Sequence, residues 1–157
     1  MLVLYYSQTG ATASVANQIK SCLNADIEEI VCEKPYDGDF GATIERSKKE
    51  RESGEMPAIK PIVSDVQKYD IIFLGYPIWF GTYALPVSTL IDKVSFEGKT
   101  IVPFCTFGSG GLESSTEDLK SHLPQSDIKE GFGIRNARIN TLQEELDDFL
   151  KRYGYMP

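Results

Sequence analysis

Three apolar runs constrain the fold of this 157-residue chain more than any other feature of its sequence. They cover Leu2–Tyr6, Ile71–Tyr76 and Thr100–Thr106. Continuous apolar runs of this length are typical of parallel strands that are covered by other elements on both faces. We therefore expect these three segments to form the centre of a parallel sheet.

The segments between the apolar runs show the periods of amphipathic helices or of short strands. One apolar stripe consists of Val15, Ala16, Ile19 and Leu23. We expect helices over residues 13–23, 43–53, 85–94, 112–122 and 141–153, and further strands within residues 26–31 and 127–134. This alternation predicts an α/β fold, namely a three-layer, doubly wound, five-stranded parallel sheet formed as a single domain over residues 1–157.

Two prolines and one charged segment complicate this prediction. Pro77 is expected to end the second apolar run, and Pro103 conflicts with a central strand because proline lacks a ladder donor, so a bulge is expected there. The helix over residues 43–53 has only Ile44 as a clearly apolar residue. It is therefore interpreted as a solvated excursion.

Composition excludes several classes of function. Hydrophobic residues make up 41% of the chain and charged residues 25%, as in a globular domain. The net charge of -7 disfavours nucleic acid and suits a basic protein partner, although solubility alone can account for it. No apolar run approaches membrane-spanning length and no signal peptide is recognisable, so a cytoplasmic location is expected. Cys105 is expected in the core, and a metal site is not expected with one histidine, His122.

The loop after the first strand has the features of an anion site. It combines hydroxyl side chains and a glycine at the start of a helix, where backbone N–H groups point outward. It has neither the lysine of a nucleoside-triphosphate loop nor the glycine spacing of a dinucleotide site. A strand–helix turn that is merely capped by hydroxyl groups is the alternative. The candidate phosphate-binding residues are Ser7, Gln8, Thr9, Gly10, Ala11 and Thr12.

Two further loops follow the other apolar runs and are expected at the same sheet edge. The second contains two large aromatic residues, which a planar ligand would explain, although Trp79 could instead plug the core or a partner interface. The third is rich in glycine, which allows backbone groups close to a ligand, or forms a flexible turn. The candidates are Pro77, Ile78, Trp79, Phe80 and Gly81 in the second loop, and Thr106, Phe107, Gly108, Ser109, Gly110 and Gly111 in the third.

With these three loops the chain resembles the flavodoxin family, and the resemblance covers nearly its whole length. Residues 7–12 resemble its phosphate loop, and residues 75–79 and 106–110 resemble the two loops that enclose the isoalloxazine ring. The resemblance implies a flavodoxin-like sheet of strand order 2-1-3-4-5, a noncovalent FMN and electron transfer. It also implies a short-chain member of the family.

Two positions depart from the family pattern. Ala11 occupies a position where many flavodoxins have asparagine, so one polar contact near the phosphate is expected to be absent. The third loop lacks the tyrosine that covers the outer flavin face in well-known flavodoxins, and Phe107 is its only aromatic residue. We therefore expect an altered stacking arrangement at the flavin ring.

Three classes of function are consistent with such a fold. An FMN electron carrier between redox proteins is favoured, with the acidic surface facing the partners. An FMN-dependent NAD(P)H:quinone or flavin oxidoreductase is the alternative, which an uncovered flavin face would suit. A phosphorelay receiver domain has a similar topology, but Ser7 and Pro77 occupy the regions where its acidic residues would be needed.

Overall fold

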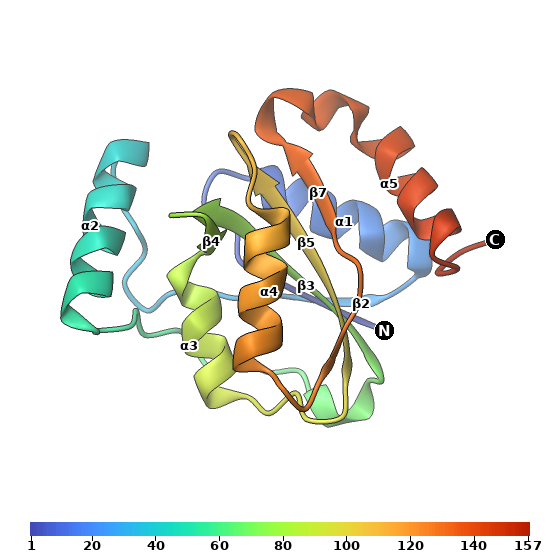
Figure 1. Cartoon of the computed structure of the whole chain (residues 1–157), viewed down its shortest axis with the longest axis horizontal. Helices are drawn as coiled ribbons and strands as arrows, with labels where there is room; N and C mark the ends of the chain where they lie inside the picture. Colours follow the sequence, from blue (N-terminus) through green and yellow to red (C-terminus); the bar gives the residue numbers. More distant parts are fainter.

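The computed structural model describes residues 1–157, and its centre is a largely parallel sheet (Figure 1). The order of the main strands is β2-β1-β3-β5-β6, and β7 also pairs with β5. Because β6 and β7 both lie parallel to β5 along the same side, they form a fifth strand in two parts. The predicted order 2-1-3-4-5 is therefore confirmed. The bounds are β1 (Leu2–Tyr5), β2 (Asp26–Glu29), β3 (Ile71–Trp79), β5 (Thr100–Phe107), β6 (Asp127–Ile128) and β7 (Phe132–Arg135).

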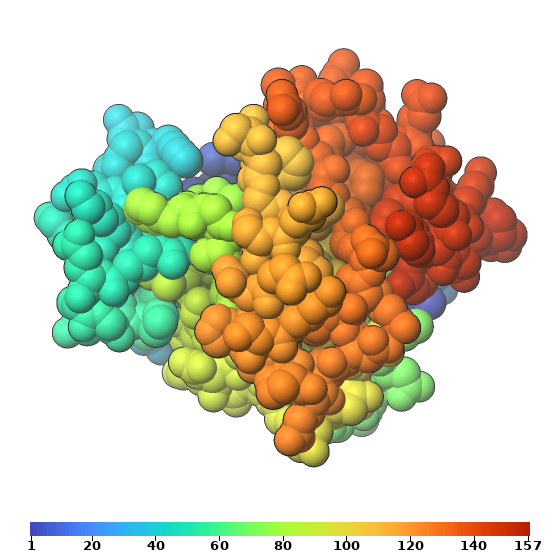
Figure 2. Space-filling view, in the orientation of Figure 1, coloured from blue at the N-terminus to red at the C-terminus, as the bar shows by residue number.

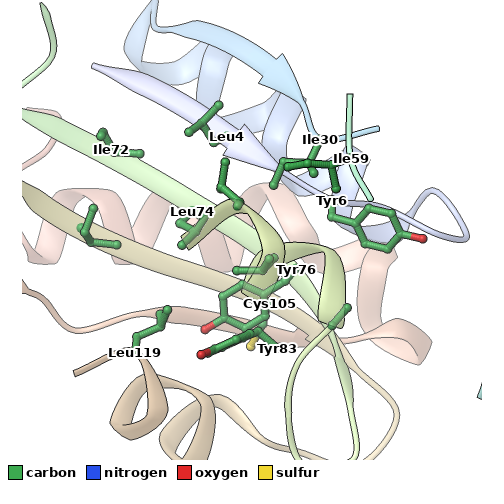
Figure 3. Close-up of a cluster of buried hydrophobic side chains, with 14 of the residues drawn as sticks. Leu4, Tyr6, Ile30, Ile59, Ile72, Leu74, Tyr76, Tyr83, Cys105 and Leu119 are labelled. Atoms are coloured by element: carbon green, nitrogen blue, oxygen red, sulfur yellow. The ribbon is translucent and has the colours of Figure 1, made fainter. Parts of the chain in front are cut away.

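Helices cover both faces of this sheet, which gives the predicted three layers. Side chains alternate along β1, so that Val3 packs among residues of α1 (Ala11–Leu23) and α5 (Leu142–Arg152). Leu4 packs on the other face, together with residues of α3 (Leu85–Lys93) and α4 (Leu112–His122). Figure 3 shows this second cluster, with Leu4 of β1 beside Leu74 of β3 and Tyr76 further along the same strand. Short 3-10 helices span Val66–Lys68 and Asn136–Thr141.

The two central strands approach each other through one glycine. Gly75 of β3 lies opposite Phe104 of β5, and a Cβ atom at position 75 would be 2.1 Å from the phenyl ring. The missing side chain therefore leaves the space into which the ring of Phe104 packs. Cys105 is fully buried as predicted, and burial raises the pKa of its thiol to about 12.

Pro103 is accommodated without the expected bulge, so that prediction is wrong. The register between β3 and β5 continues without interruption through the Leu74–Pro103 pair. On the other side of β5, the carbonyl of Ile101 accepts from the amide of Lys129, and Pro103 faces the same side two residues later. Its missing N–H therefore falls at the break between β6 and β7, where no ladder partner needs it.

Pro77 does not end the third strand, which is a second correction. β3 runs on to Trp79 and then turns back as an antiparallel hairpin with β4 (Thr82–Tyr83). Pro77 still pairs in register with Thr106 of β5. The second candidate loop is therefore a strand end followed by a tight turn.

The charged helix α2 (Phe40–Ser53) begins earlier than predicted and is only partly solvated. Asp39 caps it by accepting a hydrogen bond from the amide of Ala42 at 2.8 Å. Its inner face buries two small polar residues, Thr43 and Ser47. Figure 1 shows α2 beside the β4 hairpin. The helix therefore packs at the carboxyl edge of the sheet and is not the solvated excursion that the sequence predicted.

Two further features concern the molecule as a whole. No helix is both long enough and apolar enough to cross a lipid bilayer. The side chains also form no group of three or more histidine, cysteine or acidic residues that could hold a metal ion.

We predict that Gly75→Ala destabilises the fold. The added methyl group would displace the ring of Phe104, and overpacking of a core costs about 1–3 kcal/mol. Urea denaturation should show a lower midpoint with an unchanged slope. Gly108→Ala is the control, because no atom lies within 4 Å of the added Cβ. Equal stability of the two variants would contradict this account of the β3–β5 contact.

Candidate functional site

A cavity of about 460 Å³ lies at the carboxyl ends of β1, β3 and β5. From β1 the chain continues to β2 on one side of the sheet, whereas β3 lies on the other side of β1. The cavity therefore lies at the switch point at which doubly wound sheets bind ligands. Figure 2 shows a hollow there, between the start of α2 in cyan and the loop after β5 in gold, with the blue N-terminal loop visible inside it. The lining residues are Gln8, Thr9, Gly38, Asp39, Phe40, Thr43, Pro77, Ile78, Trp79, Thr106, Phe107, Gly108 and Asn136.

The first loop combines residues that line the cavity with residues that shape the loop. Gln8 and Thr9 line the cavity, whereas Ser7 does not. The hydroxyl oxygen of Ser7 accepts hydrogen bonds from the amides of Gly10 and Ala13, both at 3.2 Å. The amides of Ala11 and Thr12 have no acceptor within the protein. Two unpaired N–H groups at the start of α1 are therefore free for an anion.

Thr12 ties the first loop to the third. Its hydroxyl group is buried and lies 2.8 Å from the hydroxyl group of Thr106, at the end of β5. Thr12 is therefore positioned as a structural link beneath the cavity, while Thr106 also contributes to the lining. Gly10 and Ala11, like Ser7 and Thr12, are outside the lining residues.

Trp79 lies at the end of β3 and is only 3% exposed. The expectation that both aromatic residues of the second candidate loop lie in a loop is therefore wrong for Trp79. Its ring packs edge-on against Tyr6 and Tyr36, with centroids 5.7 and 5.1 Å away. It nevertheless contributes to the cavity lining together with Pro77 and Ile78. Trp79 is therefore a fixed wall, held in place by two tyrosines.

The two tyrosines are themselves anchored to the cavity. The Tyr6 hydroxyl donates to the side-chain carbonyl of Gln8, whose amide donates to the backbone carbonyl of Tyr36 at 2.8 Å. Burial raises the pKa of both tyrosines, and the Glu50 carboxylate that accepts from Tyr36 raises its pKa further. Both rings therefore remain neutral, and Gln8 is held in one orientation.

The third loop reaches the cavity only with its first part. Thr106, Phe107 and Gly108 line it, whereas Gly111 packs against β3. A Cβ atom on Gly111 would lie 2.6 Å from the side chain of Ile78, and its φ of +121° disfavours any other residue. The predicted residues outside the lining in these two loops are Phe80, Gly81, Ser109, Gly110 and Gly111.

Five lining residues were not predicted from the sequence. Four of them lie at or just before the start of α2, and the fifth follows β7. The loop after β2 reaches this edge because β2 lies parallel to β1. Asp39 as a helix cap was the signal that could have located the helix start, whereas nothing in the sequence marks the fifth residue. These residues are Gly38, Asp39, Phe40, Thr43 and Asn136.

The cavity contains a single ionisable side chain, that of Asp39. Its carboxylate is used as the cap of α2. Aromatic surface comes from Trp79, Phe107 and Phe40, and the last of these is 60% exposed. The arrangement therefore offers stacking surface, neutral hydrogen-bonding groups and helix N–H donors, but no cation.

Fold and cavity together define a doubly wound α/β protein with a ligand site at the carboxyl edge of its sheet. A sequence model of the family described as Flavodoxin matches residues 1–152. The chain belongs to the flavodoxin family. No curated protein sequence matches the chain.

Solved structures agree with this family assignment. A candidate flavoprotein from Bacteroides eggerthii shares 32% identity at a TM-score of 0.83, covering 96% of this chain and 94% of the other. One from Bacteroides uniformis shares 29% identity at a TM-score of 0.80, covering 93% and 96%. A flavoprotein from Lactobacillus acidophilus, solved in complex with FMN, shares 23% identity and has the same fold at a TM-score of 0.73, covering 92% and 97%.

We predict that Thr106→Val destabilises the protein by about 1–3 kcal/mol, because it leaves the buried hydroxyl group of Thr12 without a partner. Thr106→Ser keeps the hydroxyl group and is the control. The double variant Thr12→Val, Thr106→Val should lose less stability than the sum of the two single variants, measured by urea denaturation. Additive losses would show that the two hydroxyl groups do not interact.

Proposed function

We propose that the protein binds FMN noncovalently in the carboxyl-edge cavity and carries electrons between redox proteins. The observation that supports this most directly is that the free helix amides of Ala11 and Thr12 closely follow Thr9, which lines a cavity with aromatic walls. A volume of about 460 Å³ lies within the usual range of small-molecule and cofactor sites. Membership of the flavodoxin family gives independent support for a flavin.

Different residues of the chain contact the phosphate and the ring of the cofactor in this proposal. The unpaired amides of Ala11 and Thr12 bind the phosphate, and the positive end of the α1 dipole stabilises it. Trp79 and Phe107 contact the flavin ring, and Phe40 covers it from α2. When bound, FMN supplies the capacity to accept and release electrons, and the protein sets its position and local charge.

The carrier and the oxidoreductase roles make different demands on the cavity. Its one ionisable group, Asp39, is used in helix capping, so an oxidoreductase here would depend on the flavin alone, without a free acid or base from the lining. Rapid oxidation of NAD(P)H by the purified holoprotein alone would overturn the carrier role and favour the reductase. Turnover that requires a separate reductase would support the carrier.

The partners in this proposal are proteins with basic surfaces. The net charge of -7 favours their association through long-range attraction, which salt screens. The rate of electron transfer to a basic redox protein should therefore fall as ionic strength rises. A rate independent of salt would contradict this part of the proposal.

The decisive experiment compares FMN with riboflavin, which lacks the phosphate. The purified protein is expected to carry a flavin visible spectrum, and the stripped protein should bind FMN far more tightly than riboflavin. The reason is that the Ala11 and Thr12 amides have no acceptor within the protein, and in this proposal only the phosphate provides one. A colourless protein that binds neither compound would overturn the proposal, and equal affinities would overturn the phosphate assignment.

We predict that Phe40→Ala weakens FMN binding by about 0.5–1.5 kcal/mol, roughly 2- to 12-fold in Kd, because a stacked aromatic ring is lost. Phe40→Leu should recover only part of the affinity. Val63→Ala removes an even more exposed apolar side chain that is outside the cavity lining and is the control. Fluorescence titration measures each Kd, and an unchanged value for Phe40→Ala would exclude this residue from the ring contact.

We predict that Asp39→Asn raises the midpoint potential of the bound FMN. Asparagine still caps α2, so the change removes mainly the negative charge that opposes an added electron. Two charges about 8 Å apart in water interact by about 0.5 kcal/mol, equivalent to roughly 20 mV. Spectroelectrochemical titration checks the shift, and Glu97→Gln, an exposed acid outside the lining, is the control. A lowered potential would contradict the electrostatic account.

A further inference from the structure

The turn between β3 and β4 has an unusual backbone for its sequence. Trp79 pairs with Thr82 across it, so only Phe80 and Gly81 form the turn. Both have positive φ values, +55° and +74°. Positive φ at both central positions defines the type I′ turn, whose twist matches that of the two strands it joins.

The residues at these positions do not favour a type I′ turn. Its first position prefers asparagine, aspartate or glycine, and a bulky residue such as Phe80 is strained in the left-handed region. A type II turn needs positive φ only at its second position, where Gly81 stands. Local preference therefore favours type II, whereas the hairpin favours type I′, and the two turns compete for the same four residues.

Side chains from two helices hold the turn in its strained form. The hydroxyl group of Ser114, in the first part of α4, donates to the carbonyl of Gly81. Arg51 of α2 lies 3.5 Å from the carbonyl of Trp79, and its guanidinium is 5.1 Å from the ring centre of Phe80. Figure 1 shows the β4 hairpin between these two helices, and α4 packs directly against β4.

Ser114 uses its single proton for this contact despite a local alternative. The carbonyl of Gly111, three residues earlier on the same helix, is also within reach at 3.3 Å. A serine hydroxyl donates one hydrogen bond, and the shorter contact is the one to Gly81. The hydroxyl group therefore joins the start of α4 to the hairpin rather than only capping its own helix.

We propose that Ser114 is a positioning residue that selects the type I′ form of the Phe80–Gly81 turn. Its loss allows the turn to exchange with the type II form, in which Phe80 takes a negative φ. The turn directly follows Trp79, which lines the cavity. Its state therefore sets how the chain leaves Trp79 beside the proposed site of the FMN ring, a consequence that rests on the proposed function.

The test uses the full-length chain, first without flavin. In Ser114→Ala, 15N relaxation dispersion should reveal microsecond-to-millisecond exchange at the amides of Phe80 and Gly81, because the second turn becomes about fivefold more populated. Ser114→Thr keeps the hydroxyl group and should behave like the wild type. Ser121→Ala, at an exposed position on the same helix, is the matched control. Identical dispersion in Ser114→Ala and wild type would overturn the proposal.

A second background isolates the strain at Phe80. Glycine accepts a positive φ freely, so Phe80→Gly should make Ser114 dispensable, and adding Ser114→Ala should produce no exchange. Exchange that persists in the double variant would overturn the competition between turns. This arm also remains informative if Ser114→Ala alone folds poorly.

The same variants are then loaded with FMN. Ser114→Ala should weaken FMN binding several-fold and shift its midpoint potential, and Ser114→Thr should restore both. If no variant binds FMN, the proposed function fails while the dispersion experiment still decides the role of Ser114. If exchange appears in Ser114→Ala but the FMN affinity and the midpoint potential stay unchanged, Ser114 holds the turn without influencing flavin binding. That result would overturn the link between the turn and FMN.

Discussion

The parallel register of β1, β3 and β5 is the constraint on which the site depends. β1 pairs with β3 only as far as the Tyr5–Gly75 pair, whereas β3 continues for four more residues, of which Tyr76 and Pro77 still pair with β5. The end of β3 therefore extends past the end of β1. The first loop therefore begins closer to the middle of the sheet than the loops after β3 and β5. This offset along the strands leaves space for the cavity next to Thr9.

Most of the fold could be predicted because it follows from burial. Apolar runs and helical stripes report which side chains leave water, and these located the strands and the helix over residues 112–122. The hairpin could not be predicted in this way, since β4 has two residues and Pro77 is a usual strand terminator. Its stability comes from contacts with α4 and α2, which are distant in sequence.

The site was predicted in position but only partly in detail. Sequence places hydroxyl groups in the first loop, yet it does not tell which way they point. Ser7 turns back to its own loop and Thr12 turns inward to Thr106, so Thr9 is the one hydroxyl residue of this loop that lines the cavity. The contribution of α2 was missed for a related reason. Its buried face consists of small polar side chains, so hydrophobic periodicity does not reveal it.

The site as proposed must bind an acidic cofactor within an acidic protein. The net charge of -7 and the nearby Asp39 carboxylate both oppose the arrival of a phosphate, and no lysine or arginine lines the cavity to offset them. Two helix amides with a dipole behind them offset only part of this opposition. The remaining affinity must come from the ring, through the fixed wall at Trp79 and the cover at Phe40. The same charges would oppose an added electron, so in the proposed complex stacking would hold the cofactor while the surrounding negative charge would lower its potential.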